Sequence, residues 1–127
     1  MTAVSMQAWL LMALAGAIGT LCRYALGRWV LNMAGGTFPW GTFAVNMIGC
    51  LLIGVVAASI EKEALVSPMV RLVVIVGFLG GFTTFSSFAL EGYSLWHTHD
   101  WLAAGGYVLL TNLTGLGAVW AGHRLVA

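Results

Sequence analysis

The sequence predicts an all-helical membrane protein with four transmembrane helices, and three observations support this prediction. Of the 127 residues, 61% are hydrophobic and only 7% are charged, whereas a soluble domain carries roughly a quarter charged residues. Four apolar stretches each approach the ~20 residues that a helix needs to cross a lipid bilayer. The six tryptophans fall near the ends of these stretches, as the aromatic belts of membrane proteins do; they are Trp9, Trp29, Trp40, Trp96, Trp101 and Trp120.

The expected helices fill the chain as a single transmembrane domain over residues 1–127. They cover residues 6–31, 41–60, 70–96 and 101–122. The first is read as a helix and not as a signal peptide, because no positively charged segment precedes it. Gly35, Gly36 and Pro39 indicate a turn between the first and second helices. Ser67 and Pro68 provide an N-cap and a first-turn proline for the third helix, and residues 97–100 form the last turn.

The charged residues exclude some functions and leave the orientation open. A net charge of +1 provides no basic patch for nucleic acid. With four spans, three basic residues fall on the side of the termini and two on the other: Lys62, Arg71 and Arg124 against Arg23 and Arg28. This is almost no positive-inside bias. Such a chain can insert in both orientations and pair as an antiparallel homodimer. The alternative is that Arg23, well inside the first helix, does not act as a loop charge.

Residues 80–88 are the most unusual segment of the chain. They read Gly-Gly-Phe-Thr-Thr-Phe-Ser-Ser-Phe inside a run that no charge interrupts from Leu72 to Leu90. A glycine pair weakens a helix. Backbone groups freed in hydrocarbon cost several kcal/mol each unless protein or a cavity satisfies them. We therefore expect the third helix to be broken near Gly80–Thr83, and we expect function at this segment.

A polar face follows the glycines. At helical spacing, Thr84, Ser87 and Glu91 share one face, with Phe85 and Phe88 beside them. The edges of phenyl rings carry partial positive charge and can stabilise an anion. The alternative is ordinary packing, with hydroxyls bonded back to their own helix. The combination with the glycine pair favours a binding site.

Other polar residues fall within the second and fourth helices. Thr42 and Asn46 share a face, and Asn46 either joins two helices or lines a transport path. A narrow stripe of the fourth helix consists of Tyr107, Thr111, Thr114 and Ala118. Asn112 points elsewhere, which predicts a hydrogen bond to another helix. Close packing is expected at Gly115, Gly117 and Gly122.

The remaining reactive side chains do not indicate catalysis. Arg23 either extends to the membrane surface or anchors an anion at an entrance, and Glu91 is either functional or solvated. His97, His99 and Asp100 form no cluster typical of a metal site. Cys22 and Cys50 lie in apolar stretches and are expected to be free, buried thiols. No nucleophile–base pair, Walker loop or Rossmann fingerprint is present, so we do not expect an enzyme.

The segments named above resemble the Fluc (CrcB-type) fluoride channels. The resemblance rests on residues 80–88, on Gly41-Thr42-Phe43-Ala44-Val45-Asn46, and on Gly16-Ala17 with Arg23-Tyr24. Length, number of spans and weak charge bias agree, so it covers the whole chain. It implies an antiparallel, dual-topology homodimer in the cell membrane, with a bacterial inner membrane expected. Two separate pores would let fluoride leave passively, which lowers its cytoplasmic toxicity.

The resemblance also implies roles for individual residues. Phe85 and Phe88 match the pore-lining phenylalanines, and Asn46 matches the pore asparagine. A polar track would consist of Thr42, Ser87, Tyr107 and Thr111. The backbone carbonyls of Gly80 and Thr83, from both subunits, would hold a structural Na⁺ at the dimer centre. Arg23 and Glu91 match positions near the pore ends.

The chain departs from the family pattern at two places. Ser87 stands where threonine is common, which preserves the hydroxyl. Gly115 stands where the track often has a further hydroxyl, with Thr114 next to it. The far end of the track is therefore not defined by the resemblance.

Two other functions remain as alternatives. A small, dual-topology, proton-coupled exporter of the multidrug type needs a carboxylate in its first helix, and residues 6–31 contain none. A structural subunit of a larger membrane complex would need a stoichiometric partner.

Overall fold

The structure is a computed structural model that describes residues 3–63 and 66–127, and every regular element in it is helical. In chain order these are α1 (Met6–Ala34), α2 (Trp40–Lys62), α3 (Pro68–Arg71), η1 (Leu72–Leu79), α4 (Gly80–Phe82), α5 (Phe85–His97) and α6 (Trp101–Val126). The elements from α3 to α5 follow one another as a bent third helix over Pro68–His97. The described part of the chain thus has four helices that are long and apolar enough to cross a membrane, as predicted.

The helix ends have the predicted capping residues, and one further residue acts as an N-cap. The Ser67 hydroxyl accepts a hydrogen bond from the Val70 N–H at 3.2 Å, and Pro68 follows in the first turn. Gly35 ends α1 with a φ of 65°, which glycine adopts without strain. Asp100, which the sequence placed only in a turn, caps α6 by accepting from the Ala103 N–H at 3.2 Å. The predicted helices are each a few residues too short.

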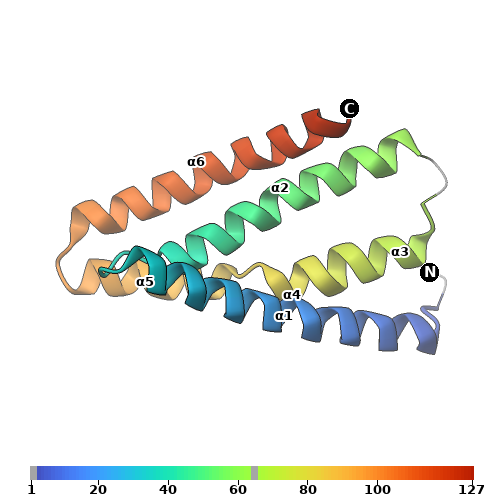
Figure 1. Cartoon of the computed structure of the whole chain (residues 1–127), viewed down its shortest axis with the longest axis horizontal. Coiled ribbons are helices and arrows are strands. Elements are labelled where there is room, and N and C mark those ends of the chain that lie inside the picture. Colours follow the sequence, from blue (N-terminus) through green and yellow to red (C-terminus); the bar gives the residue numbers. More distant parts are fainter. Residues whose placement is uncertain (1–2, 64–65) are drawn as a thin grey trace.

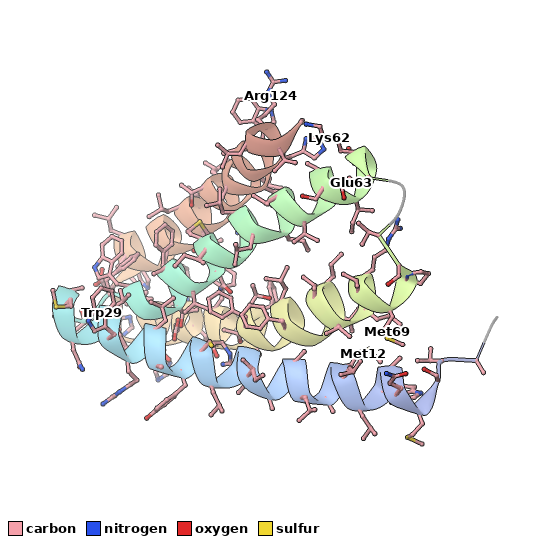
Figure 2. All side chains as sticks on the ribbon, turned by 45° about the vertical axis from the view of Figure 1, so that its right-hand side comes forward. Met12, Trp29, Lys62, Glu63, Met69 and Arg124 are labelled. Carbon is pink, nitrogen blue, oxygen red and sulfur yellow. The ribbon has the colours of Figure 1, made fainter. Side chains whose placement is uncertain are left out.

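The four long helices pack as two pairs. α1 lies along the third helix, and α2 lies along α6 (Figure 1). The start of α1, the end of α6 and the connection from α2 to α3 lie at the same end, as an even number of spans requires (Figure 1). Figure 2 shows Lys62 and Arg124 at this end and Trp29 at the opposite end. Arg28 precedes Trp29 directly in the chain, so basic residues occur at both ends (Figure 2).

Glycines allow the paired backbones to approach closely. A Cβ atom on Gly19 would collide with the Phe78 carbonyl, and one on Gly81 would collide with the Gly16 carbonyl. In the other pair, a Cβ atom on Gly122 would collide with the Leu51 carbonyl. Small residues serve this purpose in membrane proteins, where van der Waals contact drives helix association. Close packing is confirmed at Gly122. It is wrong for Gly117, where a Cβ atom would meet nothing within 4 Å.

The third helix breaks at two threonines. Gly80 keeps helical angles (φ −62°, ψ −36°), whereas Thr83 (φ −86°, ψ 158°) and Thr84 (φ −149°, ψ 117°) are extended. The break therefore lies at the end of the predicted range, and the glycine pair does not cause it. Gly81 instead permits contact with α1. Before the break, η1 is a π-helix, which the sequence did not predict; such segments often occur near functional sites.

The outer surface is strongly apolar. The large exposed hydrophobic side chains come from all four long helices, and all six tryptophans are among them. Within the described residues, Tyr107 is the only buried residue other than glycine that is not purely apolar, and no charged residue is buried. A surface of this kind suits lipid or another protein as its neighbour.

The glycine contact between α2 and α6 generates a stability prediction. Gly122→Ala places a methyl group against the Leu51 carbonyl, so the two helices must move apart. Overpacking of this kind costs about 1–3 kcal/mol. We expect the thermal midpoint of the detergent-purified protein to fall by several degrees.

Gly105→Ala is the matched control, because a Cβ atom at Gly105 in the same helix meets nothing within 4 Å. It should leave the midpoint unchanged or raise it slightly, since alanine favours the helix. Equal midpoints for the two variants would contradict the close approach of α2 and α6.

Candidate functional site

Two cavities flank the break in the third helix. The larger, with a volume of about 480 Å³, lies between α2, α6 and the third helix. Its lining includes Asn46, Gly80, Thr83, Thr84, Phe85, Phe88 and Thr111. The smaller, about 150 Å³, lies between α1, α2 and the start of α5. Its lining includes Arg23, Arg28, Thr42, Thr84 and Ser87. Most of the predicted site residues thus line one of two cavities that share Thr84.

Asn46 binds the broken backbone from α2. Its Nδ2 donates to the Thr84 carbonyl at 3.0 Å, and its Oδ1 accepts from the Thr84 N–H at 2.9 Å. One side chain therefore satisfies both backbone groups of the extended residue. Of the two roles left open for Asn46, the structure establishes the interhelical bond. An amide has a second N–H, and Asn46 also lines the larger cavity.

Thr84 and Ser87 form the start of the polar face on α5. The Thr84 Oγ1 accepts from the Ser87 N–H at 3.2 Å and donates to the Ser87 Oγ at 3.1 Å. The prediction that these two side chains lie on the same face is confirmed. Thr84, however, is the N-cap of α5 and not one of its helical residues. This N-cap gives the Ser87 N–H a hydrogen-bond partner in place of the backbone carbonyl that the break removes.

Glu91 joins three helices through two hydroxyls. The Thr42 hydroxyl on α2 donates to the Glu91 Oε1 at 2.7 Å, and the Tyr107 hydroxyl on α6 donates to the Oε2 at 2.8 Å. Tyr107 is completely buried. The alternative of a freely solvated Glu91 is therefore wrong. Sequence spacing offered no signal for this three-way contact, because its partners lie 49 and 16 residues away.

The two phenylalanines of α5 have different surroundings. Their ring centroids are 5.6 Å apart, with planes tilted by 57°. Phe88 is buried and packs edge-to-face against Tyr107 at 5.1 Å. Phe85 is 78% exposed in the single chain. Both line the larger cavity, so each can present a ring to a small species there.

Thr111 has the only buried side-chain polar atom without a partner among the described residues. Its Oγ1 neither accepts nor donates a hydrogen bond. Thr111 also lines the larger cavity. A buried hydroxyl that lacks a partner costs free energy. The hydroxyl is therefore free to donate a hydrogen bond to a ligand when the side chain turns toward the cavity.

Two other polar residues of α6 bond to carbonyls of their own helix, and of these Asn112 also lines the larger cavity. The Thr114 hydroxyl donates to the Leu110 carbonyl of its own helix and also approaches the Met47 sulfur. The interhelical hydrogen bond predicted for Asn112 is wrong, because its Nδ2 donates to the Val108 carbonyl one turn earlier in α6, at 2.7 Å.

Arg23 contacts the break from α1. Its Nε donates to the Gly81 carbonyl at 3.1 Å, and its side chain also lines the smaller cavity. The Leu79 carbonyl accepts from both the N–H and the hydroxyl of Thr83. Among the described residues, no hydrogen bond reaches the carbonyls of Gly80 or Thr83. Such free backbone oxygens fit a hard cation such as Na⁺.

The other candidate metal and thiol residues lie apart from the break. Within the described residues, no three His, Cys, Asp or Glu side chains gather as metal ligands. Cys22 and Cys50 are free thiols, as predicted. The expected burial of Cys22 is wrong for the single chain, since this side chain is exposed, while Cys50 is half-buried.

The chain is similar to known proteins over nearly its whole length. Residues 10–123 match the family model described as CrcB-like protein, Camphor Resistance (CrcB). A protein of Rhizobium etli named fluoride-specific ion channel FluC is 46% identical over 117 residues, or 92% of this chain and 94% of its own length. Proteins of the same name from Rhizobium leguminosarum and Nitrosococcus oceani are 48% and 45% identical; the alignments cover 89% and 93% of this chain and 90% and 93% of theirs. The chain therefore belongs to the CrcB-like family.

Proposed function

We propose that this protein is a fluoride-selective channel of the cell membrane. It conducts fluoride passively out of the cell and thereby limits its toxicity in the cytoplasm. The name of the similar proteins supports this function. The main structural support is the unpartnered Thr111 hydroxyl, which lies in the same cavity lining as Asn46 and two phenylalanine rings.

Fluoride must lose its water shell inside such a channel, so the protein has to replace the lost hydrogen bonds. The free N–H of Asn46 and the Thr111 hydroxyl are suitable donors. The edges of Phe85 and Phe88 add partial positive charge without a fixed cation. In the smaller cavity, Arg23 and Arg28 attract anions toward Thr42 and Ser87.

Glu91 controls two donors of the proposed track. The hydroxyls of Thr42 and Tyr107 each have one proton, and both protons are directed to Glu91. These hydroxyls serve fluoride only when they turn away from the carboxylate. Glu91 also repels an anion that reaches it. We therefore assign Glu91 to the end of the path, where fluoride exchanges with water.

We propose that two copies form an antiparallel homodimer around a structural Na⁺. The basic residues divide almost evenly between the ends, which permits both orientations. The larger cavity and the exposed Phe85 ring offer a surface for a second copy. The free carbonyl oxygens of Gly80 and Thr83, together with those of the other copy, would be the ligands of this cation.

The two alternatives have less support. A proton-coupled exporter needs a membrane carboxylate in its first helix, and α1 has none. A substrate-dependent proton flux that Glu91→Gln abolishes would favour it. A structural subunit would copurify with a stoichiometric partner and show no flux alone.

The central prediction concerns ion flux from liposomes. Purified protein should release trapped fluoride quickly, as read by a fluoride electrode, when a potassium ionophore balances the charge. Chloride-loaded liposomes should empty far more slowly. Equal rates for the two anions would rule out a fluoride-selective channel.

The aromatic edges can be tested by removing the rings. Phe85→Ile and Phe88→Ile should each slow fluoride release by roughly tenfold or more, because an aliphatic side chain lacks the positive edge. Size-exclusion profiles should stay unchanged. Unaltered flux in both variants would remove the rings from the mechanism.

Thr111 provides a substitution with little structural cost. Thr111→Val removes a hydroxyl that has no protein partner, so thermal stability should not fall, whereas fluoride flux should decrease by roughly tenfold, the effect of one lost hydrogen bond to an ion. Thr114→Val is the control, since its hydroxyl bonds to its own helix. Equal flux in the two variants would argue against Thr111 as a fluoride ligand.

A further inference from the structure

We propose that Arg23 is a positioning residue that holds the broken turn of the third helix, so that the carbonyls of Gly80 and Thr83 keep their orientation. In an unbroken α-helix the Gly81 carbonyl accepts from the N–H four residues later, which here belongs to Phe85. Phe85 lies beyond the extended residues. The Arg23 Nε takes that place at 3.1 Å, from a helix 58 residues earlier in the chain. The part that concerns cation binding rests on the proposed Na⁺ site.

The bonds around the break leave Arg23 as the support on the α1 side. Asn46 of α2 fixes both backbone groups of Thr84. Among the residues that the structure describes, Thr83 forms hydrogen bonds only to Leu79, in the segment before the break. Arg23 is therefore the side chain that fixes the peptide between Gly81 and Phe82 from a different helix. A hydrogen bond from a charged group is stronger than one between neutral groups.

The glycine contacts place the guanidinium at the right distance. Gly19 and Gly16 of α1 touch the backbone of the third helix at Phe78 and Gly81. The spacing of the two helices is thus fixed one turn before Arg23. This spacing brings the Gly81 carbonyl within reach of the guanidinium, and the hydrogen bond offsets the rotamer freedom that the side chain loses.

Arg23 also connects this turn with the smaller cavity. Guanidinium has five N–H groups, and the Nε accounts for one. The side chain lines the cavity together with Arg28, Thr42 and Ser87. An anion in the cavity and the Gly81 carbonyl therefore share one cation. This arrangement couples occupation of the cavity to the orientation of the carbonyls.

A charge effect and a positioning effect predict opposite results for cation binding. If Arg23 acts only as a positive charge, Arg23→Gln removes repulsion and should increase the affinity for Na⁺. If it positions the carbonyls, the same change should weaken Na⁺ binding by about tenfold, which is the effect of one lost charged hydrogen bond. Arg28→Gln removes a charge from the same cavity without touching the break.

The first measurement does not depend on fluoride. The thermal midpoint of purified wild-type protein is followed as Na⁺ replaces a large organic cation, and the half-maximal Na⁺ concentration is compared among variants. We expect it to rise about tenfold in Arg23→Gln, to recover partly in Arg23→Lys, and to stay unchanged in Arg28→Gln. A lower or equal value in Arg23→Gln overturns the proposal.

The second measurement observes the carbonyl itself. Labelling with ¹³C-carbonyl glycine and ¹⁵N-phenylalanine marks only two peptide bonds, Gly77–Phe78 and Gly81–Phe82. In Arg23→Gln, the Gly81 carbonyl signal should move to lower frequency as its hydrogen bond is lost, while the Gly77 signal stays in place. Arg28→Gln should move neither. An unmoved Gly81 signal overturns the proposal.

The two measurements separate this inference from the proposed function. If Na⁺ does not stabilise the wild type, the Na⁺ site fails, and the Gly81 signal alone decides whether Arg23 holds the turn. If Arg23→Gln does not fold, Arg23→Lys is compared with Arg28→Lys by the same two measurements. A weaker Na⁺ response and a shifted Gly81 signal in Arg23→Lys alone support the proposal, and equal behaviour overturns it.

Discussion

The structure depends on one constraint: the backbone groups released at Thr83 and Thr84 must find partners inside an apolar environment. Each unsatisfied group in hydrocarbon costs several kcal/mol. Side chains from two other helices provide some of the partners: Asn46 of α2 binds both backbone groups of Thr84, and Arg23 of α1 binds the Gly81 carbonyl. Among the described residues, the carbonyls of Gly80 and Thr83 accept no hydrogen bond. The break is thus one point at which polar bonds connect α1 and α2 to the third helix, and the bond from Thr42 of α2 to Glu91 is another. Elsewhere these helices meet mainly through apolar and glycine contacts.

The same constraint explains why the polar residues gather where they do. A residue that satisfies the break has to lie beside it, and the cavities on either side share Thr84 as a common wall. Asn46 and Arg23 consequently support the backbone and line a cavity at once. The proposed binding capacity then follows from a structural need, because donors with further N–H groups are already in place. Glu91 shows the complementary case, an acceptor already occupied by two hydroxyls.

The sequence predicted those features that depend on local composition. Apolar length and tryptophan positions were sufficient for the four helices, and Ser67 with Pro68 was sufficient for the start of the third. The unusual segment 80–88 located the break to within a residue or two, although Gly81 proved to serve contact with α1. Contacts such as Asn46 with Thr84, or Glu91 with Tyr107, depend on how one helix is aligned beside another, and periodicity within a single helix does not contain that information. The prediction for Asn112 was wrong because a carbonyl of its own helix, that of Val108, took the place of the expected partner on another helix. The proposed cation and the proposed second copy lie outside what a single chain can contain.

The π-helix η1 allows the third helix to lose a residue without a change in its contacts further along the chain. Bonds between residues i and i+5 hold more residues per turn than an α-helix does. If a residue is lost between Leu72 and Val76, the segment can return to α-helical bonding, and the shortening is absorbed upstream. Gly77, Gly81 and Thr84 then keep their register against α1 and α2. Past Gly80 the described chain has no such segment, and the loss of one residue would rotate every contact that closes the break. Natural variation in the length of this helix should therefore be confined to its first half.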